Sequence, residues 1–133
     1  MHGVKAKLLV IGDEAQARRK LTIIFTSLGY GVRASPNGSS ALEAIRDDIP
    51  DIILSDLEFP RMLGVGFLSI VRRHFPSIRV IAMSRAFRGT AVPPGIAADA
   101  FYERARRLSS LLGIVEAMAC PRKSLAIRFR GFH

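Results

Sequence analysis

The sequence predicts a doubly wound α/β domain, in which helices cover both faces of one parallel sheet. Short apolar runs, typical of strands buried on both faces, recur five times along the chain. Short links join them to segments of helical period, as in the connections of a doubly wound sheet. With 133 residues, 49% of them hydrophobic, the chain has the length and composition of one globular domain.

The five apolar runs are the expected strands. Glycine, proline or charged residues, which interrupt regular structure, bound most of them. The strands are expected at residues 7–11, 30–34, 51–56, 78–84 and 98–102. Because the carboxyl ends of parallel strands meet at one edge, we expect a ligand site outside that edge.

Helical periodicity appears after four of the five strands. Leu21, Ile24 and Phe25 fall on one face of a helix expected to end near Gly29. Ser39 or Ser40 is expected to cap the second helix, because a hydroxyl can accept a hydrogen bond from the first turn. The four helices are expected near residues 15–28, 39–45, 67–75 and 108–118.

The stretch between the fourth and fifth strands has a different character. Residues 85–98 contain Gly89, Pro93, Pro94 and Gly95, all of which oppose helix formation. We therefore expect no long helix in this connection.

Polar side chains follow the expected strands at the edge where a ligand would bind. Asp13 and Glu14 follow the first strand, Asp56 ends the third, Ser84 ends the fourth and Arg104 follows the fifth. Carboxylates from two strand ends can share a divalent cation such as Mg²⁺. A hydroxyl and a cationic side chain on the other flank suit a phosphoryl group, with one carboxylate as its acceptor.

This order of residue types resembles the receiver domains of two-component signalling, the CheY-like superfamily, over about residues 6–118. The segments that carry the resemblance are LLVIGDE at 8–14, LGY at 28–30 with PNG at 36–38 and AL at 41–42, PDIILSD at 50–56, FPRMLG at 59–64, VIAMS at 80–84 and ADAF at 98–101. The resemblance implies a flavodoxin-like (βα)5 fold with strand order 2-1-3-4-5, in which the fourth helix is short or disordered here.

The resemblance also implies a role for each candidate residue. Asp56 falls at the position of the phosphoacceptor, and Asp13, Asp56 and the backbone carbonyl of Glu58 fall where the family holds Mg²⁺. Ser84 matches the hydroxyl residue that senses the phosphoryl group, and Phe101 matches the aromatic residue that follows it. Each has a simpler alternative: Asp13 as a helix N-cap, Ser84 as a strand-end hydroxyl and Phe101 as a core residue.

Three departures from the family pattern bear on this site. Gly12 replaces the first acidic position, so Mg²⁺ affinity should fall. Arg104 stands where the family has a lysine, with Ala105 in place of the proline that usually follows, and its planar guanidinium cannot place a point charge as an ammonium does. The Pro-rich stretch at 85–98 alters the surface that normally signals output.

The chain is strongly basic, with twenty Lys and Arg against eleven Asp and Glu. A net charge of +9 favours acidic partners, but the basic residues are spread along the chain and no helix-turn-helix or similar module is present. Nucleic acid is therefore not an expected partner. We expect a receiver-like domain at 1–120 and a basic tail at 121–133.

The function expected from the sequence is that of a single-domain response regulator, not an enzyme. A histidine kinase or phosphotransfer protein would phosphorylate Asp56, and an unidentified downstream protein would read the change. The alternative is a degenerate receiver that acts as a phosphorylation-independent docking or dimerisation module. The absence of a signal peptide or a long apolar run, together with the single Cys120, predicts a cytoplasmic protein without a membrane span.

Overall fold

A computed structural model describes residues 3–58 and 64–119 of the chain. Five parallel strands form one sheet in the order β2-β1-β3-β4-β5, which confirms the expected topology. The strands are β1 (Lys7–Ile11), β2 (Gly31–Ser35), β3 (Ile52–Asp56), β4 (Arg79–Ser84) and β5 (Ala100–Glu103).

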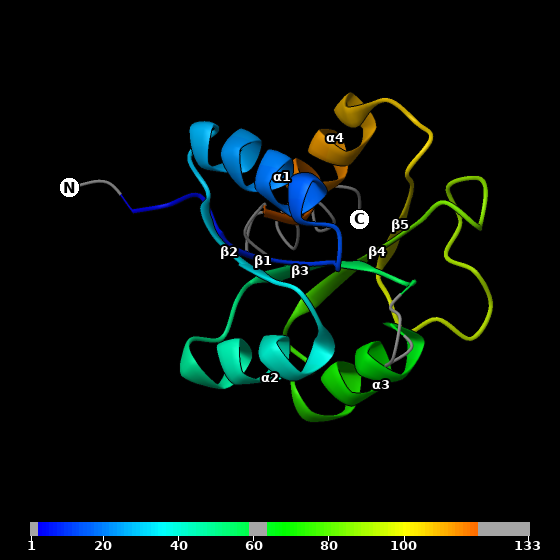
Figure 1. Ribbon diagram of the computed structural model, residues 1–133, viewed down its shortest axis with the longest axis horizontal. Helices are drawn as coiled ribbons and strands as arrows, with labels where there is room; N and C mark the ends of the chain where they lie inside the picture. The colour runs from blue at the N-terminus through cyan, green and yellow to red at the C-terminus, as the bar shows by residue number, and fades with distance from the viewer. Residues whose placement is uncertain (1–2, 59–63, 120–133) are drawn as a thin grey trace, which may run out of the picture.

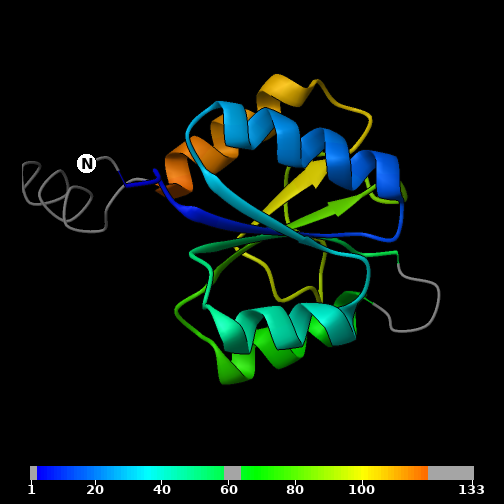
Figure 2. The same cartoon turned by 60° about the vertical axis from the view of Figure 1, so that its left-hand side comes forward.

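Helices lie on both faces of the sheet, as Figures 1 and 2 show. One face carries α1 (Ala15–Ser27) and α4 (Leu108–Ala119), and the other carries α2 (Gly38–Asp47) and α3 (Gly64–His74). Each face has its own core of buried apolar side chains. Phe25 and Leu111 belong to the first core, and Ile45 and Phe67 belong to the second.

The central strand β3 explains why the site has a fixed position. All five of its residues are buried, and it pairs with β1 on one side and β4 on the other. Ile53 packs into the core under α2 and α3, whereas Ile52 and Leu54 pack into the core under α1 and α4. This alternation of side chains sets the register of the strand, so the position of Asp56 at its carboxyl end is determined by the core.

Two helix caps differ from the expected ones. Glu14, not Asp13, caps α1, because its carboxylate accepts hydrogen bonds from the backbone nitrogens of Gln16 and Ala17. The serines expected to cap α2 lie inside the helix, and Asn37 accepts the hydrogen bond from the backbone nitrogen of Ser40 at 2.8 Å. In both helices the cap is one or more residues away from the expected position. Asp13 is thereby left without the capping role.

The connection between β4 and β5 contains no helix, as the Pro and Gly residues predicted. Residues 85–99 form turns and bends, with Gly89 and Gly95 in the left-handed region at φ 95° and 81°. Val92 and Ile96 from this segment pack against the core under α2 and α3. The irregular chain, seen on the right of Figure 1, therefore replaces a helix in covering that part of the sheet.

Some expectations concern residues outside the described part of the chain. Pro60, Cys120 and the basic tail at 121–133 belong to this group. Within the described residues, no helix combines the length and the apolar character needed to cross a membrane.

Candidate functional site

Four of the five polar residues predicted at the carboxyl ends of the strands line one pocket of about 420 Å³. Asp13 and Glu14 follow β1, Asp56 ends β3 and Arg104 follows β5. The pocket is lined by these four residues together with Glu58, Arg85 and Ala86. The strand ends thus bring together the acidic and cationic side chains that the sequence predicted for the site.

Asp56 and Arg104 form the closest charged contact in the pocket. Arg104 Nη1 donates a hydrogen bond to Asp56 Oδ1 at 2.7 Å, and only 13% of the Asp56 side chain and 16% of the Arg104 side chain are exposed. The backbone nitrogen of Arg104 also donates to the carbonyl of Ser84, which ties the loop after β5 to the end of β4. The cation therefore reaches Asp56 from a backbone position fixed by the sheet.

The environment of Asp56 disfavours its charged form. Burial is the largest influence and raises the pKa of the carboxyl above its ordinary value. Arg104 lowers the pKa of Asp56 through its charge and its hydrogen bond, whereas the charges of Glu58 and Asp13 raise it. A buried carboxyl with a shifted pKa and a cationic partner is typical of a functional site.

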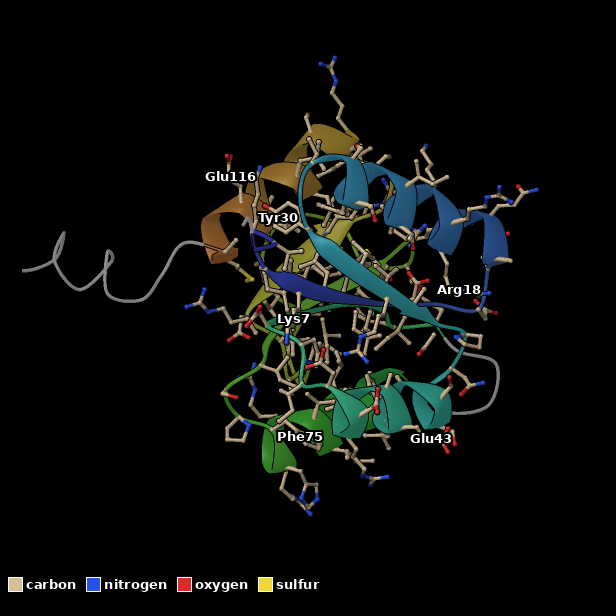
Figure 3. All side chains as sticks on the ribbon, turned by 90° about the vertical axis from the view of Figure 1, so that its left-hand side faces the viewer. Lys7, Arg18, Tyr30, Glu43, Phe75 and Glu116 are labelled. Carbon is tan, nitrogen blue, oxygen red and sulfur yellow. The ribbon has the colours of Figure 1, made fainter. Side chains whose placement is uncertain are left out.

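Gly12 allows the Asp56 carboxylate to take its observed position. A Cβ atom on Gly12 would lie 2.4 Å from Asp56 Oδ2, closer than nonbonded atoms approach. The Gly12 carbonyl accepts a hydrogen bond from Arg18 Nη1 at 2.6 Å, and Figure 3 labels Arg18 on α1. From the sequence, Gly12 counted only as a missing metal ligand. The tertiary structure gives it a second role, as the space into which Asp56 turns.

The side chain of Glu58 holds Ser84. Ser84 Oγ donates a hydrogen bond to Glu58 Oε2 at 2.6 Å and accepts bonds from the backbone nitrogens of Ala86 and Phe87. The sequence indicated Glu58 only through its backbone carbonyl, so this carboxylate contact was not predicted. The Glu58 carboxylate therefore accepts the hydrogen bond of the same hydroxyl that the resemblance assigns to sensing a phosphoryl group.

The remaining predicted residues lie in different surroundings. Phe101 is 2% exposed and packs in the core under α2 and α3, next to Ala82 in the sheet register. Asp13 lines the pocket but is exposed. Phe101 thus occupies the core position of its simpler alternative, and its role as a switch residue stays a prediction.

The arrangement around Asp56 offers an incomplete set of metal ligands. Within residues 3–58 and 64–119, no three His, Cys, Asp or Glu residues lie close enough together to hold a metal ion. Asp13 and Asp56 line one pocket, but Oδ1 of Asp56 already accepts a hydrogen bond from Arg104. The described residues therefore do not form a metal site in this arrangement, and Mg²⁺ binding at Asp13, Asp56 and Glu58 stays a prediction.

Curated relatives match part of this chain. The regulatory protein AtoC of Escherichia coli is 33% identical over 78 residues, 59% of this chain and 17% of AtoC. The probable transcriptional regulator ycf27 of Pyropia yezoensis is 36% identical over 73 residues, 55% of this chain and 30% of that protein. The matched region thus makes up less than a third of either relative.

Solved structures share the fold over most of the chain. The response regulator TrrA of Thermotoga maritima, in complex with Mg²⁺–BeF, has a TM-score of 0.76 at 22% identity, covering 84% of this chain and 97% of its own. The chemotaxis protein CheY4 of Vibrio cholerae has a TM-score of 0.73 at 21% identity, covering 85% and 98%. The family defined as the response regulator receiver domain matches residues 8–101, so this chain belongs to the receiver domains of two-component response regulators.

Proposed function

We propose that this receiver domain accepts a phosphoryl group on Asp56. The supporting observation is the Asp56 side chain itself, which is buried at the carboxyl end of β3 and paired with Arg104 in a pocket open to a donor. A carboxylate oxygen forms a bond to phosphorus while the bond from phosphorus to the donor's leaving group breaks. The leaving group takes the electron pair, and the product is an aspartyl phosphate.

Arg104 supplies positive charge on the side of the site that faces β5. In the unphosphorylated protein its guanidinium holds the Asp56 carboxylate at 2.7 Å. After transfer, the same cation lies close to a group that carries more negative charge, and such charge-assisted contacts are strong. In this role Arg104 orients the Asp56 carboxylate before transfer and neutralises negative charge on the phosphorylated product.

Ser84 and Glu58 form the element that phosphorylation would change. Ser84 Oγ can donate only one hydrogen bond, and it donates that bond to Glu58. A phosphoryl group on Asp56 offers new acceptor oxygens and repels the Glu58 carboxylate. In the proposed response, Ser84 turns to the phosphoryl group, Glu58 is released, and the segment after β4 shifts, because Ala86 and Phe87 are hydrogen-bonded to Ser84.

The proposed partners are a histidine kinase, or a phosphotransfer protein, and a protein that reads the phosphorylated state. TrrA, which shares the fold, has been solved in complex with the histidine kinase ThkA. We propose that the downstream protein binds the segment 85–99. This segment is hydrogen-bonded to Ser84, and its backbone is irregular instead of helical.

Acetyl phosphate is the simplest donor with which to test the proposal. Incubation with Mg²⁺ should add one phosphoryl mass to the full chain, and borohydride reduction should convert the modified residue to homoserine at position 56. Asp56→Asn should abolish the adduct. Asp47→Asn is the matched control, because Asp47 is an exposed carboxylate at the end of α2. An unmodified chain, or an equal adduct on Asp56→Asn, would overturn the proposal and leave a phosphorylation-independent docking module.

A further inference from the structure

A second pocket lies beside the acceptor site, between α1, α4 and the ends of β4 and β5. Its volume is about 400 Å³, within the range of small-molecule sites. Figure 1 shows α1 and α4 side by side on this face of the sheet. Glu14, Arg85 and Arg104 line both pockets, so the second pocket adjoins the one that contains Asp56.

The lining of this pocket is cationic at its rim. Lys20, Arg85, Arg104 and Arg106 carry four positive charges. Glu14 is the one carboxylate among the lining residues, and both of its oxygens accept hydrogen bonds from the first turn of α1. Within the described residues, neither Lys20 nor Arg85 forms an ion pair. Arg104 is paired with Asp56 and Arg106 with Glu103, so among the described residues Lys20 and Arg85 are the lining cations that form no ion pair, and their charges favour an anion here.

The floor of the pocket is apolar. Leu21, Met83, Tyr102 and Leu111 line it, and each is less than a tenth exposed. An inorganic anion would satisfy the cationic residues but would leave the exposed parts of Leu21, Tyr102 and the half-buried Leu108 in water. A ligand with an apolar or aromatic body and a phosphate group matches both parts of the lining.

Arg104 lines both pockets. Only its Nη1 contacts Asp56, and no hydrogen bond from Nε or Nη2 is formed within the described part of the chain. A phosphate in the second pocket would compete with Asp56 for this guanidinium. Because coupling between two sites is reciprocal, loss of the Asp56 charge should strengthen binding in the second pocket.

From this geometry we infer that the pocket between α1 and α4 binds a small organic phosphate, and that this ligand draws Arg104 away from Asp56. The inference concerns binding alone and does not depend on phosphorylation of Asp56. Its test therefore omits both the divalent cation and the phosphodonor.

Phenyl phosphate is a suitable probe, because it combines a phosphate with a flat apolar ring. Isothermal titration of the full chain at constant ionic strength should show tighter binding of phenyl phosphate than of inorganic phosphate, and no binding of phenol. Lys20→Ala and Arg85→Ala should each weaken binding about fivefold, as expected for loss of one solvent-exposed ion pair. Asp56→Asn should strengthen binding about fivefold, within the usual range of coupling between sites.

Arg19→Ala is the matched control, because Arg19 is an exposed residue of α1 adjacent to Lys20 that does not line the pocket. This variant loses the same charge and should bind phenyl phosphate as the parent chain does. An equal loss in Arg19→Ala and Lys20→Ala would overturn the inference, because it would indicate general attraction to a basic protein. Equal affinity of Asp56→Asn and the parent chain would overturn the coupling through Arg104.

Discussion

Gly12 and Asp56 lie so close together that the glycine determines where the carboxylate can lie. A Cβ atom on Gly12 would come within 2.4 Å of Asp56 Oδ2, while Asp56 Oδ1 accepts the hydrogen bond from Arg104. The two departures from the family pattern are therefore connected. The space left at Gly12 accommodates one oxygen of the carboxylate, and the other oxygen contacts the guanidinium of Arg104.

Gly12→Ala should weaken the pair between Asp56 and Arg104. The added methyl group would force the carboxylate to rotate, and such overpacking costs about 1 kcal/mol or more of unfolding free energy. Urea denaturation would measure the loss. Gly66→Ala is the control, because a Cβ at Gly66 meets nothing within 4 Å and alanine favours a helix. If Gly12→Ala costs the same in an Arg104→Ala background, the two positions are independent.

Asp56→Asn should stabilise the fold at neutral pH. Because burial raises the pKa of Asp56, the folded state holds the proton more tightly than the unfolded state does. The stability that this proton contributes is complete below the unfolded pKa and is lost as pH rises through the folded pKa. Asparagine does not ionise, so the variant should be more stable than the parent chain once the pH exceeds the raised pKa of Asp56.

Unfolding curves measured upward from about pH 4 would test this expectation, because the ordinary pKa of an aspartate lies near that pH and the pKa of Asp56 lies above it. The advantage of Asp56→Asn should grow as pH rises. Asp47→Asn, at an exposed carboxylate, should show no such trend. A difference between Asp56→Asn and the parent chain that stays constant with pH would contradict the raised pKa.

Phosphorylation by acetyl phosphate should depend on pH through the ionisation of Asp56. The carboxylate is the reactive form, so the rate should fall as pH decreases through a pKa above the ordinary value for aspartate. Arg104→Ala removes the cation that lowers this pKa, so its rate profile should move to higher pH. Intact-mass measurements over time would give both profiles, and identical profiles would exclude an influence of Arg104 on the acceptor.

Glu58→Gln should increase the extent of phosphorylation. The Glu58 charge raises the pKa of Asp56, and the Glu58 carboxylate engages the Ser84 hydroxyl at 2.6 Å. Removing one negative charge beside the acceptor should favour the phosphorylated state by about 1 kcal/mol, or roughly fivefold. The measurement is the fraction of phosphorylated chain at steady state. Glu43→Gln, at an exposed residue of α2 labelled in Figure 3, should leave that fraction unchanged.

Mg²⁺ bound at Asp13, Asp56 and Glu58 should compete with Arg104 for the Asp56 carboxylate. The guanidinium already contacts Oδ1 of Asp56, and a cation bound to the same carboxylate would be repelled by it. Arg104→Ala should therefore bind Mg²⁺ more tightly than the parent chain, by about tenfold for a change of 1.4 kcal/mol. Calorimetric titration would measure this change. Asp13→Asn should abolish binding, and unchanged binding would place the ion elsewhere.

Several features of the fold follow from the local sequence. The apolar run at residues 52–54 is typical of a central strand buried on both faces, which places Asp56 at the carboxyl end of that strand. The Gly and Pro residues between Ser84 and β5 oppose a helix. Gly loses much conformational freedom when it becomes helical, and Pro has no backbone N–H to donate to the helix. The local sequence did not predict the helix caps, because several neighbouring polar residues can accept the capping hydrogen bond and the backbone geometry selects one of them.

The sequence by itself determined the parallel sheet and placed Asp56, Ser84 and Arg104 at the carboxyl ends of its strands, because hydrophobic periodicity and turn residues act locally. The order of the strands was predicted only through the resemblance to receiver domains. Only the tertiary structure decided which of these residues touch. Arg104 reaches Asp56 across 48 positions of the chain, and Ser84 bonds to Glu58 across 26. Such contacts depend on strand register and side-chain rotamers, which are set by packing in three dimensions.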